Sequence, residues 1–393
     1  MKILKNESNV LLITKNIKVI IDLFLGPFLT SYFLKTSMEA ITKLSMYNIY
    51  TYLILGVAAF ITGYIIRNKW QIKMFQFGII FNFIYILAIL ILQEEIVNNL
   101  WLITLLSGIS MSTYYFPMNL FSVYKIKNEE RLTFEIKIAF YKKLISIIAP
   151  IVLGMIITTT NFILTAIIIL FLSFLQIILS FFLTSEDQLD NTFNGQLAWQ
   201  KFMKDKRIKK VLFLDFLLGI SDGNSAVVLL HTILIIQSFQ TDVKLGIYTS
   251  IASALSLVAL QLYKKYLTKK KNNWICFICA IIPIIAAIIL TIYKNDFTLL
   301  TYYFVFTIFN TILVKLTGIE VANVGNCEMI LKHFKIEYLA FHELVLNTGR
   351  IISYVLLLCV YILNPNSLEY LLIALLGITI FQSIVYQKIK KQT

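Results

Sequence analysis

Long runs of apolar residues alternate with short polar segments along almost all of the 393-residue chain. A helix needs about 20 mainly apolar residues to cross the hydrocarbon core of a bilayer. Windows of that length predict an all-α integral membrane protein with about twelve transmembrane helices. The predicted spans are 19–36, 46–66, 74–93, 99–124, 138–158, 161–183, 211–236, 245–263, 274–293, 298–322, 338–362 and 368–386.

The basic residues of the polar connections test this division, because Lys and Arg gather on the cytoplasmic side of membrane proteins. They are concentrated in the N-terminal segment, which includes Lys15 and Lys18, in every second connection and in the C-terminal segment. The intervening connections hold only Lys35, Lys43, Lys244 and Lys294. This alternation predicts an even number of spans, with both termini in the cytoplasm, in a multi-pass protein of the cell membrane.

The composition agrees with a membrane protein and excludes a soluble globule. Hydrophobic residues make up 59% of the chain and charged residues 14%, whereas soluble domains carry about 25% charged residues. The net charge of +14 follows from the placement of the basic residues, so we expect no nucleic-acid partner. Cys276 and Cys279 form a CxxC within an apolar run, without a second Cys/His pair, and we expect no metal and no cofactor. Frequent Ile, Lys and Asn are typical of an AT-rich bacterium.

A polar, charged connection divides the chain into two similar halves. We expect one six-helix bundle at 1–183, a cytoplasmic linker at 184–210 and a second bundle at 211–393. The first span opens with Asp22-Leu-Phe-Leu-Gly26 and the seventh with Asp215-Phe-Leu-Leu-Gly219, about half the chain apart. Because six is an even number, the two bundles would have the same orientation in the membrane.

The end of the linker has the pattern of a basic amphipathic helix. Residues 196–210 combine six basic residues with an apolar edge of Trp199, Phe202 and Met203. Such helices lie at the membrane surface, with the apolar edge in the headgroup region. We therefore predict one helix over 196–210 on the inner membrane surface.

Two equivalent bundles with cytoplasmic termini and a long middle loop resemble the major facilitator superfamily. That superfamily carries a G-x-x-x-D-R/K-x-G-R/K-R/K signature after its second helix. Here Gly63 matches and the segment is basic, but Arg67 stands at the acidic position and Trp70 at the second glycine. The resemblance covers nearly the whole chain through its architecture and implies a divergent member, in which helices 1, 4, 7 and 10 line a central cavity.

The seventh span contains the densest group of polar residues, Ser221-Asp-Gly-Asn-Ser225, followed by His231. Asp222 lies about 16 Å from the cytoplasmic end of the span at 1.5 Å per residue, near the middle of the bilayer. Gly223 and Asn224 favour a bend or an unwound turn. One interpretation is a protonatable carboxylate at a substrate site formed with Asn224, Ser225 and His231. The other is a structural aspartate that is neutral or ion-paired.

The tenth span adds Thr311, Lys315 and Glu320. Lys315 is a candidate to bind an anionic substrate or to pair with Asp222 across the cavity. Its long side chain could equally reach the membrane interface, which requires no function. Glu320 lies nearer the membrane edge, where we expect a gate or an ion pair.

The eleventh span carries a polar stripe that includes Glu343, Asn347 and Arg350 at helical spacing. Arg350 lies deep within the span and needs an anion or water. Asp222 and Glu320 are the internal candidates, and direct contact with substrate is the alternative. Glu343 is placed near the cytoplasmic end, where it would meet basic residues of the connection.

Asp22 and Asp215 are predicted at the cytoplasmic starts of the first and seventh spans. A carboxylate in the first turn of a helix is stabilised by the helix dipole. The alternative is a salt bridge that closes an inner gate, in which Arg67 also belongs. His342 and His333 fall at the cytoplasmic edge and need no special role.

These observations predict a secondary transporter that works as a monomer by alternating access. Proton coupling through Asp222 and export of a small amphipathic organic molecule fit an apolar, aromatic cavity with few charges. The alternatives are a flippase for lipids or lipid-linked precursors and a membrane receptor or assembly protein that does not transport. No Walker-type loop, HExxH motif or nucleophile elbow indicates an enzyme.

Overall fold

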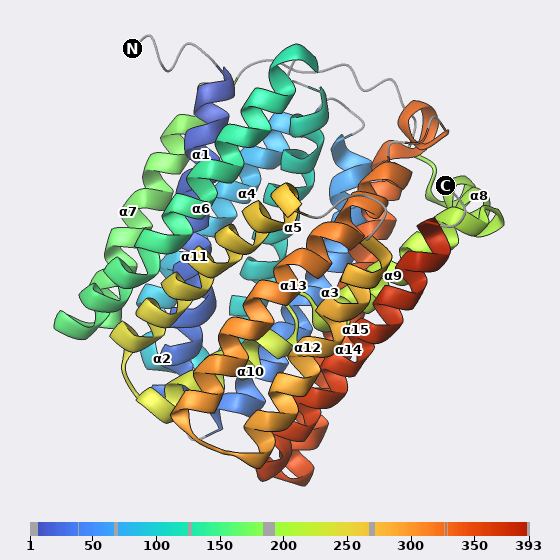
Figure 1. Cartoon of the computed structure of the whole chain (residues 1–393). Coiled ribbons are helices and arrows are strands. Elements are labelled where there is room, and N and C mark those ends of the chain that lie inside the picture. The colour runs from blue at the N-terminus through green and yellow to red at the C-terminus, as the bar shows by residue number, and fades with distance from the viewer. Residues whose placement is uncertain are drawn as a thin grey trace. The chain divides into compact units, whose positions relative to one another are not determined.

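The computed structural model describes residues 7–37, 39–66, 70–124, 128–183, 193–266, 272–325, 327 and 329–390 (Figure 1). All regular secondary structure in these ranges is helical. The first half contains α1 Glu7–Leu23, the π-helical η2 Phe24–Phe28, α2 Leu29–Thr36, α3 Ala40–Ile66, α4 Gln71–Leu92, η3 Gln93–Val97, α5 Leu100–Tyr124, α6 Asn128–Thr159 and α7 Phe162–Ser180. The second half contains α8 Gly195–Lys204, α9 Lys206–Ser221, α10 Ala226–Phe239, α11 Asp242–Tyr266, α12 Asn272–Ile292, α13 Asp296–Gly325, η5 Ile330–Phe334, α14 Lys335–Leu363, η6 Pro365–Ser367 and α15 Leu368–Lys390.

Each predicted span corresponds to one long helical segment. Among the described residues, eleven segments are long and apolar enough to cross a membrane. The 25-residue α5 is not one of these eleven segments, but it coincides with the fourth predicted span. The protein is therefore an all-helical membrane protein with about twelve spanning helices, as the apolar runs predict.

The first helix begins much earlier than predicted. Residues Glu7–Thr36 form one helical segment, so Lys15 and Lys18 lie inside it and not in an N-terminal tail. The side chain of Lys18 is only 4% exposed. Lys15, Asn16 and Lys18 lower the local hydropathy, so apolar windows place the start of the span after them, although Lys18 is buried and the other two are half-buried.

The helices form two compact units. Unit 1 comprises Met1–Lys43, Leu53–Phe193 and Thr241–Ser250, and unit 2 comprises Leu44–Tyr52, Asn194–Gln240 and Ile251–Thr393. Helices α3 and α11 thus contribute to both units. The division of the chain into 1–183, 184–210 and 211–393 remains a proposal.

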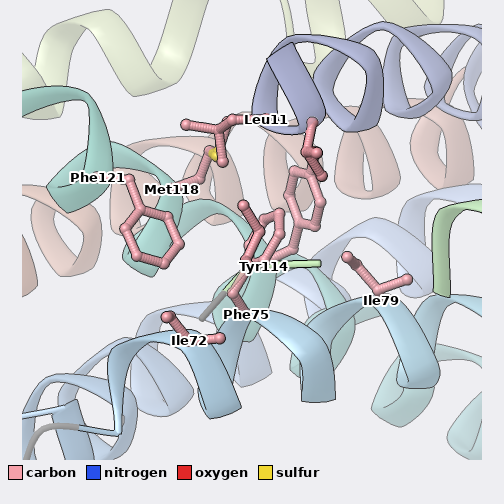
Figure 2. Packing of buried hydrophobic residues seen from close by; sticks show 9 residues of the cluster. Leu11, Ile72, Phe75, Ile79, Tyr114, Met118 and Phe121 are labelled. Carbon is pink, nitrogen blue, oxygen red and sulfur yellow. The ribbon is translucent and has the colours of Figure 1, made fainter. Parts of the chain in front are cut away.

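The core of unit 1 is built by aromatic and aliphatic residues of α1, α4 and α5 (Figure 2). The ring of Phe75 packs between those of Tyr114 and Phe121, with centroids 5.0 and 5.5 Å away. Helices α4 and α5 come this close because Gly78 has no side chain. A Cβ atom there would lie 2.5 Å from the backbone nitrogen of Tyr114.

The core of unit 2 depends on a similar close approach of α9 and α14. A Cβ atom on Gly219 would collide with the backbone carbonyl of Leu346, and one on Gly349 with that of Phe216. Because neither glycine has a side chain, the backbones of α9 and α14 pack directly against each other. This crossing sets the position of Arg350, which follows Gly349 directly.

The amphipathic segment before α9 differs from its prediction in two respects. The helix is interrupted at Asp205, whose side chain accepts hydrogen bonds from the backbone N–H groups of Arg207 and Ile208 and starts α9. The predicted single helix over 196–210 is therefore wrong. Phe202 is fully buried, with its ring 6.0 Å from that of Phe341 on α14, so protein covers this part of the apolar edge.

Candidate functional site

The seventh predicted span is a broken helix, with α9 ending at Ser221 and α10 beginning at Ala226. The sequence explains the break, because Asp, Gly, Asn and Ser all form turns more readily than helix interiors. The Asp222 carboxylate accepts a hydrogen bond from the Asn224 backbone at 2.9 Å. Ser225 caps α10 by accepting from the N–H of Val227 at 3.3 Å. Gly223 and Asn224 remain exposed.

Arg350 of α14 holds the Asp222 carboxylate at this break. Its Nη2 lies 2.5 Å from Asp222 Oδ2 and its Nε 3.2 Å from the same oxygen. The side chains of Arg350 and Asp222 are only 9% and 13% exposed. Of the two internal partners considered for Arg350, the structure selects Asp222. Removing one member of a largely buried pair leaves an uncompensated charge, which typically costs about 3–5 kcal/mol.

The guanidinium group has further partners that fix its orientation. Nη1 donates to Asn347 Oδ1 at 2.8 Å. The ring of Tyr52, contributed to unit 2 by α3, lies 5.2 Å from the guanidinium carbon, within the range of a cation–π contact. The side-chain oxygen of Asn224 accepts from Nη2 at 3.3 Å when its amide is oriented to satisfy both of its polar atoms. Arg350 therefore remains partly satisfied when Asp222 is occupied elsewhere.

Neighbouring helices satisfy the backbone groups that the break leaves open. Ser353 Oγ accepts from the N–H of Ala226 at 3.1 Å. The Tyr354 hydroxyl donates to the carbonyl oxygen of Asn224 at 3.1 Å. Gln382 of α15 donates to the carbonyl oxygen of Leu217 at 2.8 Å. These contacts with neighbouring helices stabilise the break, and the Asp222–Arg350 pair lies beside its exposed backbone.

Some of the predicted site residues gather here and others do not. Asp222, Asn224, Ser225, Asn347 and Arg350 form the connected group described above. Glu343 joins it weakly, since Asn347 Nδ2 lies 2.7 Å from the Glu343 carbonyl oxygen and 3.5 Å from its carboxylate.

His231, Lys315 and Thr311 lie outside this group. His231 is 2% exposed and its Nε2 lies 2.6 Å from the hydroxyl of Tyr302. The contacts of Asp222 therefore do not include His231, and its predicted place in a substrate cavity remains a prediction. Lys315 is exposed, and the carboxylate of Asp222 is held by Arg350 instead. The Thr311 hydroxyl donates to its own helix, to Thr307 O at 2.7 Å.

Asp22 and Asp215 do not lie in first helical turns, so the predicted role at the helix dipole is wrong for both. Asp215 lies well inside α9, is fully buried and pairs with His342 Nδ1 at 2.8 Å. His342 therefore has a defined contact that the sequence did not indicate. Asp22 lies near the end of α1 and pairs with Lys18 at 2.8 Å.

The remaining gating candidates, Glu320 and Arg67, form no gate contact that the structure describes. Glu320 of α13 is 8% exposed, and its Oε2 has no hydrogen-bond partner among the described residues. Arg67 lies outside the described residues. Within the described ranges, no group of three or more His, Cys, Asp or Glu side chains is placed to hold a metal ion.

Comparison with known proteins identifies the fold. No family model matches the chain. A curated relative, the uncharacterized protein YqgE of Bacillus subtilis (strain 168), is 23% identical over 361 residues, which are 89% of this chain and 82% of the relative.

Solved transporter structures match nearly the whole chain at low identity. A bacterial homologue of the iron transporter ferroportin, in an inward-facing state, has a TM-score of 0.68 at 14% identity, over 99% of this chain and 98% of that one. The nucleoside transporter NupG has a TM-score of 0.71 at 14% identity, over 98% and 99%. The human organic anion transporter MFSD10 has a TM-score of 0.65 at 11% identity, over 97% and 98%. The chain has the same fold as these transporters, in agreement with the architecture that its resemblance to the major facilitator superfamily implies.

Proposed function

We propose that this chain is a secondary active transporter that moves a small organic molecule across a membrane by alternating access. The broken helix between Ser221 and Ala226, with the Asp222–Arg350 pair at its edge, is the observation that carries the proposal. Non-helical backbone in a membrane-spanning segment is tolerated where protein buries it or where it lines a water-filled cavity. Neighbouring helices satisfy part of this break, but Gly223 and Asn224 are exposed, which favours a cavity. The shared fold with transporters of iron, nucleosides and organic anions supports the same function.

We infer that Asp222 is also the group through which a proton gradient drives transport. Asp222 keeps 13% of its side chain exposed, so a proton or a ligand can reach it. When Asp222 is neutralised, Arg350 keeps its hydrogen bond to Asn347 Oδ1, at 2.8 Å, and its cation–π contact with the ring of Tyr52. The site can therefore alternate between an ion pair and a neutral aspartic acid, because the guanidinium group of Arg350 has other interaction partners.

The substrate class follows from the residues around the break. The exposed groups there are the Gly223 backbone and the Asn224 amide, and next to them Tyr52 and Tyr354 form a buried stacked pair with ring centroids 5.8 Å apart. A few polar groups in an aromatic environment suit an amphipathic organic molecule. We propose export as the direction and a cytoplasmic location for both termini.

The test uses the purified chain. A thermal-shift panel of amphipathic amines, nucleosides, organic anions and lipids selects a compound that stabilises it. Vesicles containing the protein and an imposed pH gradient are then supplied with that compound. We expect accumulation against its gradient by the wild type and none by Asp222→Asn. Glu94→Gln, which changes an exposed carboxylate in η3, serves as the control and should transport normally. Unchanged uphill transport by Asp222→Asn would exclude this aspartate, and no transport of any stabilising compound would refute the function.

A further inference from the structure

A second charged group lies in unit 1 and takes no part in the site described above. Lys18 of α1 is 4% exposed along its side chain and lies 2.8 Å from Asp22 Oδ1. Its ammonium also donates to Asn82 Oδ1 of α4 at 3.0 Å. The rings of Tyr114 and Tyr115 lie 5.5 and 5.7 Å from the same nitrogen. The lysine is thus enclosed by protein on several sides.

Asp22 differs from Lys18 because its carboxylate is partly open. Its side chain is 39% exposed, although it lies inside the membrane-spanning segment Glu7–Thr36. Oδ1 accepts from Lys18, and Oδ2 accepts from the hydroxyl of Tyr115. Each carboxylate oxygen can accept two hydrogen bonds, and within the described part of the chain each accepts one, which leaves one acceptor position on each oxygen for a ligand. An ionised group facing hydrocarbon is costly, so this open side must meet water or a ligand.

The backbone next to Asp22 leaves room for a ligand. The helix changes to π geometry over Phe24–Phe28, and such segments inside α-helices frequently mark functional sites. Gly26, one turn after Asp22, is exposed, and a Cβ atom placed on it would have no neighbour within 4 Å. The partly exposed carboxylate of Asp22 is therefore followed, one helical turn later, by unoccupied space beside Gly26.

We propose that Asp22 is a subsite that binds a protonated amine of the transported molecule. The Asp22 carboxylate itself offers a ligand only hydrogen-bond acceptors, because Lys18 is buried behind it and the hydroxyl of Tyr115 already donates to it. A protonated amine supplies several N–H donors and a positive charge, and charge-assisted hydrogen bonds are the stronger kind. This inference rests on the proposed transport function, because it identifies part of the substrate, but binding tests it separately.

The experiment compares two aromatic probes that share a ring system. Naphthylmethylamine is positively charged at neutral pH and naphthylmethanol is not. We expect the wild-type chain in detergent to bind the amine at least about tenfold more tightly than the alcohol, since a charge-assisted hydrogen bond exceeds a neutral one by that order. Asp22→Asn should reduce this ratio to about one, because the amide removes the charge and keeps the size.

Two further variants separate binding from general damage. Glu94→Gln should keep the wild-type ratio. Tyr115→Phe should keep or increase it, because the lost hydroxyl frees one more acceptor on Asp22. Using a ratio within each variant removes effects of a partly destabilised fold. Equal binding of both probes by the wild type, or an unchanged ratio in Asp22→Asn, would overturn the proposal.

Transport of the same amine in vesicles distinguishes the two proposals. If binding of the amine depends on Asp22 but vesicles accumulate neither the amine nor any other stabilising compound, the transport function fails and the amine subsite stands. If vesicles accumulate the amine equally well with Asp22→Asn, the subsite fails and the transport function stands.

Discussion

Replacing Gly219 by alanine tests whether the crossing of α9 and α14 positions the charged pair. A Cβ atom at Gly219 would collide with the carbonyl of Leu346 and lie 3.1 Å from the backbone nitrogen of Arg350. These are backbone atoms of a buried helix, so a side-chain rotation cannot relieve the collision. The two helices must therefore separate, and Arg350 moves away from Asp222.

The magnitude follows from two opposing effects. Alanine is favoured over glycine inside a helix by about 1 kcal/mol. Overpacking a well-packed core typically costs about 1–3 kcal/mol. We expect Gly219→Ala to lower the free energy of unfolding by up to about 2 kcal/mol.

Gly318→Ala provides the matched control. Gly318 lies inside α13, is exposed, and a Cβ atom there would have no neighbour within 4 Å. The same substitution should therefore stabilise the protein by up to about 1 kcal/mol. The difference between the two variants isolates the overpacking cost, about 1–3 kcal/mol.

The assay is denaturant unfolding of the purified variants in one detergent, followed by affinity for the compound that stabilises the wild type. We expect Gly219→Ala to lose both stability and affinity, and Gly318→Ala to lose neither. Equal stability of the two variants would refute the close helix crossing. Lost stability with unchanged affinity would refute its link to the binding site.

Two further predictions concern other contacts. Arg350→Met should destabilise the protein by about 3–5 kcal/mol, because it leaves the largely buried Asp222 carboxylate uncompensated. Denaturant unfolding checks this, and a cost below about 1 kcal/mol, the range of solvent-exposed pairs, would contradict the burial of the pair. Phe202→Ala should lower the stability of the packing between α8 and α14 by about 3–5 kcal/mol. Limited trypsin digestion should then cut α8 faster than in the wild type, and unchanged cleavage would contradict the docking of α8.

The sequence predicts the membrane architecture well, because apolar runs of spanning length have few alternatives in a lipid environment. It also predicts the break near Asp222, since Asp, Gly and Asn in one short segment oppose a continuous helix. The pairing of Asp222 with Arg350 was one of two internal options. Choosing between them required the position of α14, which depends on Gly219 and Gly349.

The sequence fails where burial depends on tertiary packing. The sequence places Lys18 in a tail because the apolar run begins after it, yet α4 and α5 supply Asn82 and the tyrosine rings that enclose it. The sequence groups His231 with Asp222 as polar residues of one span, whereas the imidazole contacts the hydroxyl of Tyr302 on α13. No local pattern reveals either contact.

Reaction of an engineered thiol tests the central claim that the broken helix meets water from both sides of the membrane. Gly223→Cys is made in a chain without the four natural cysteines and placed in vesicles of known orientation. Ala226→Cys, at a fully buried position, is the control. A membrane-impermeant thiol reagent should modify Gly223→Cys when added to either side and leave Ala226→Cys unmodified. A Gly223→Cys thiol that reacts from one side only, or from neither, would contradict alternating access at this site.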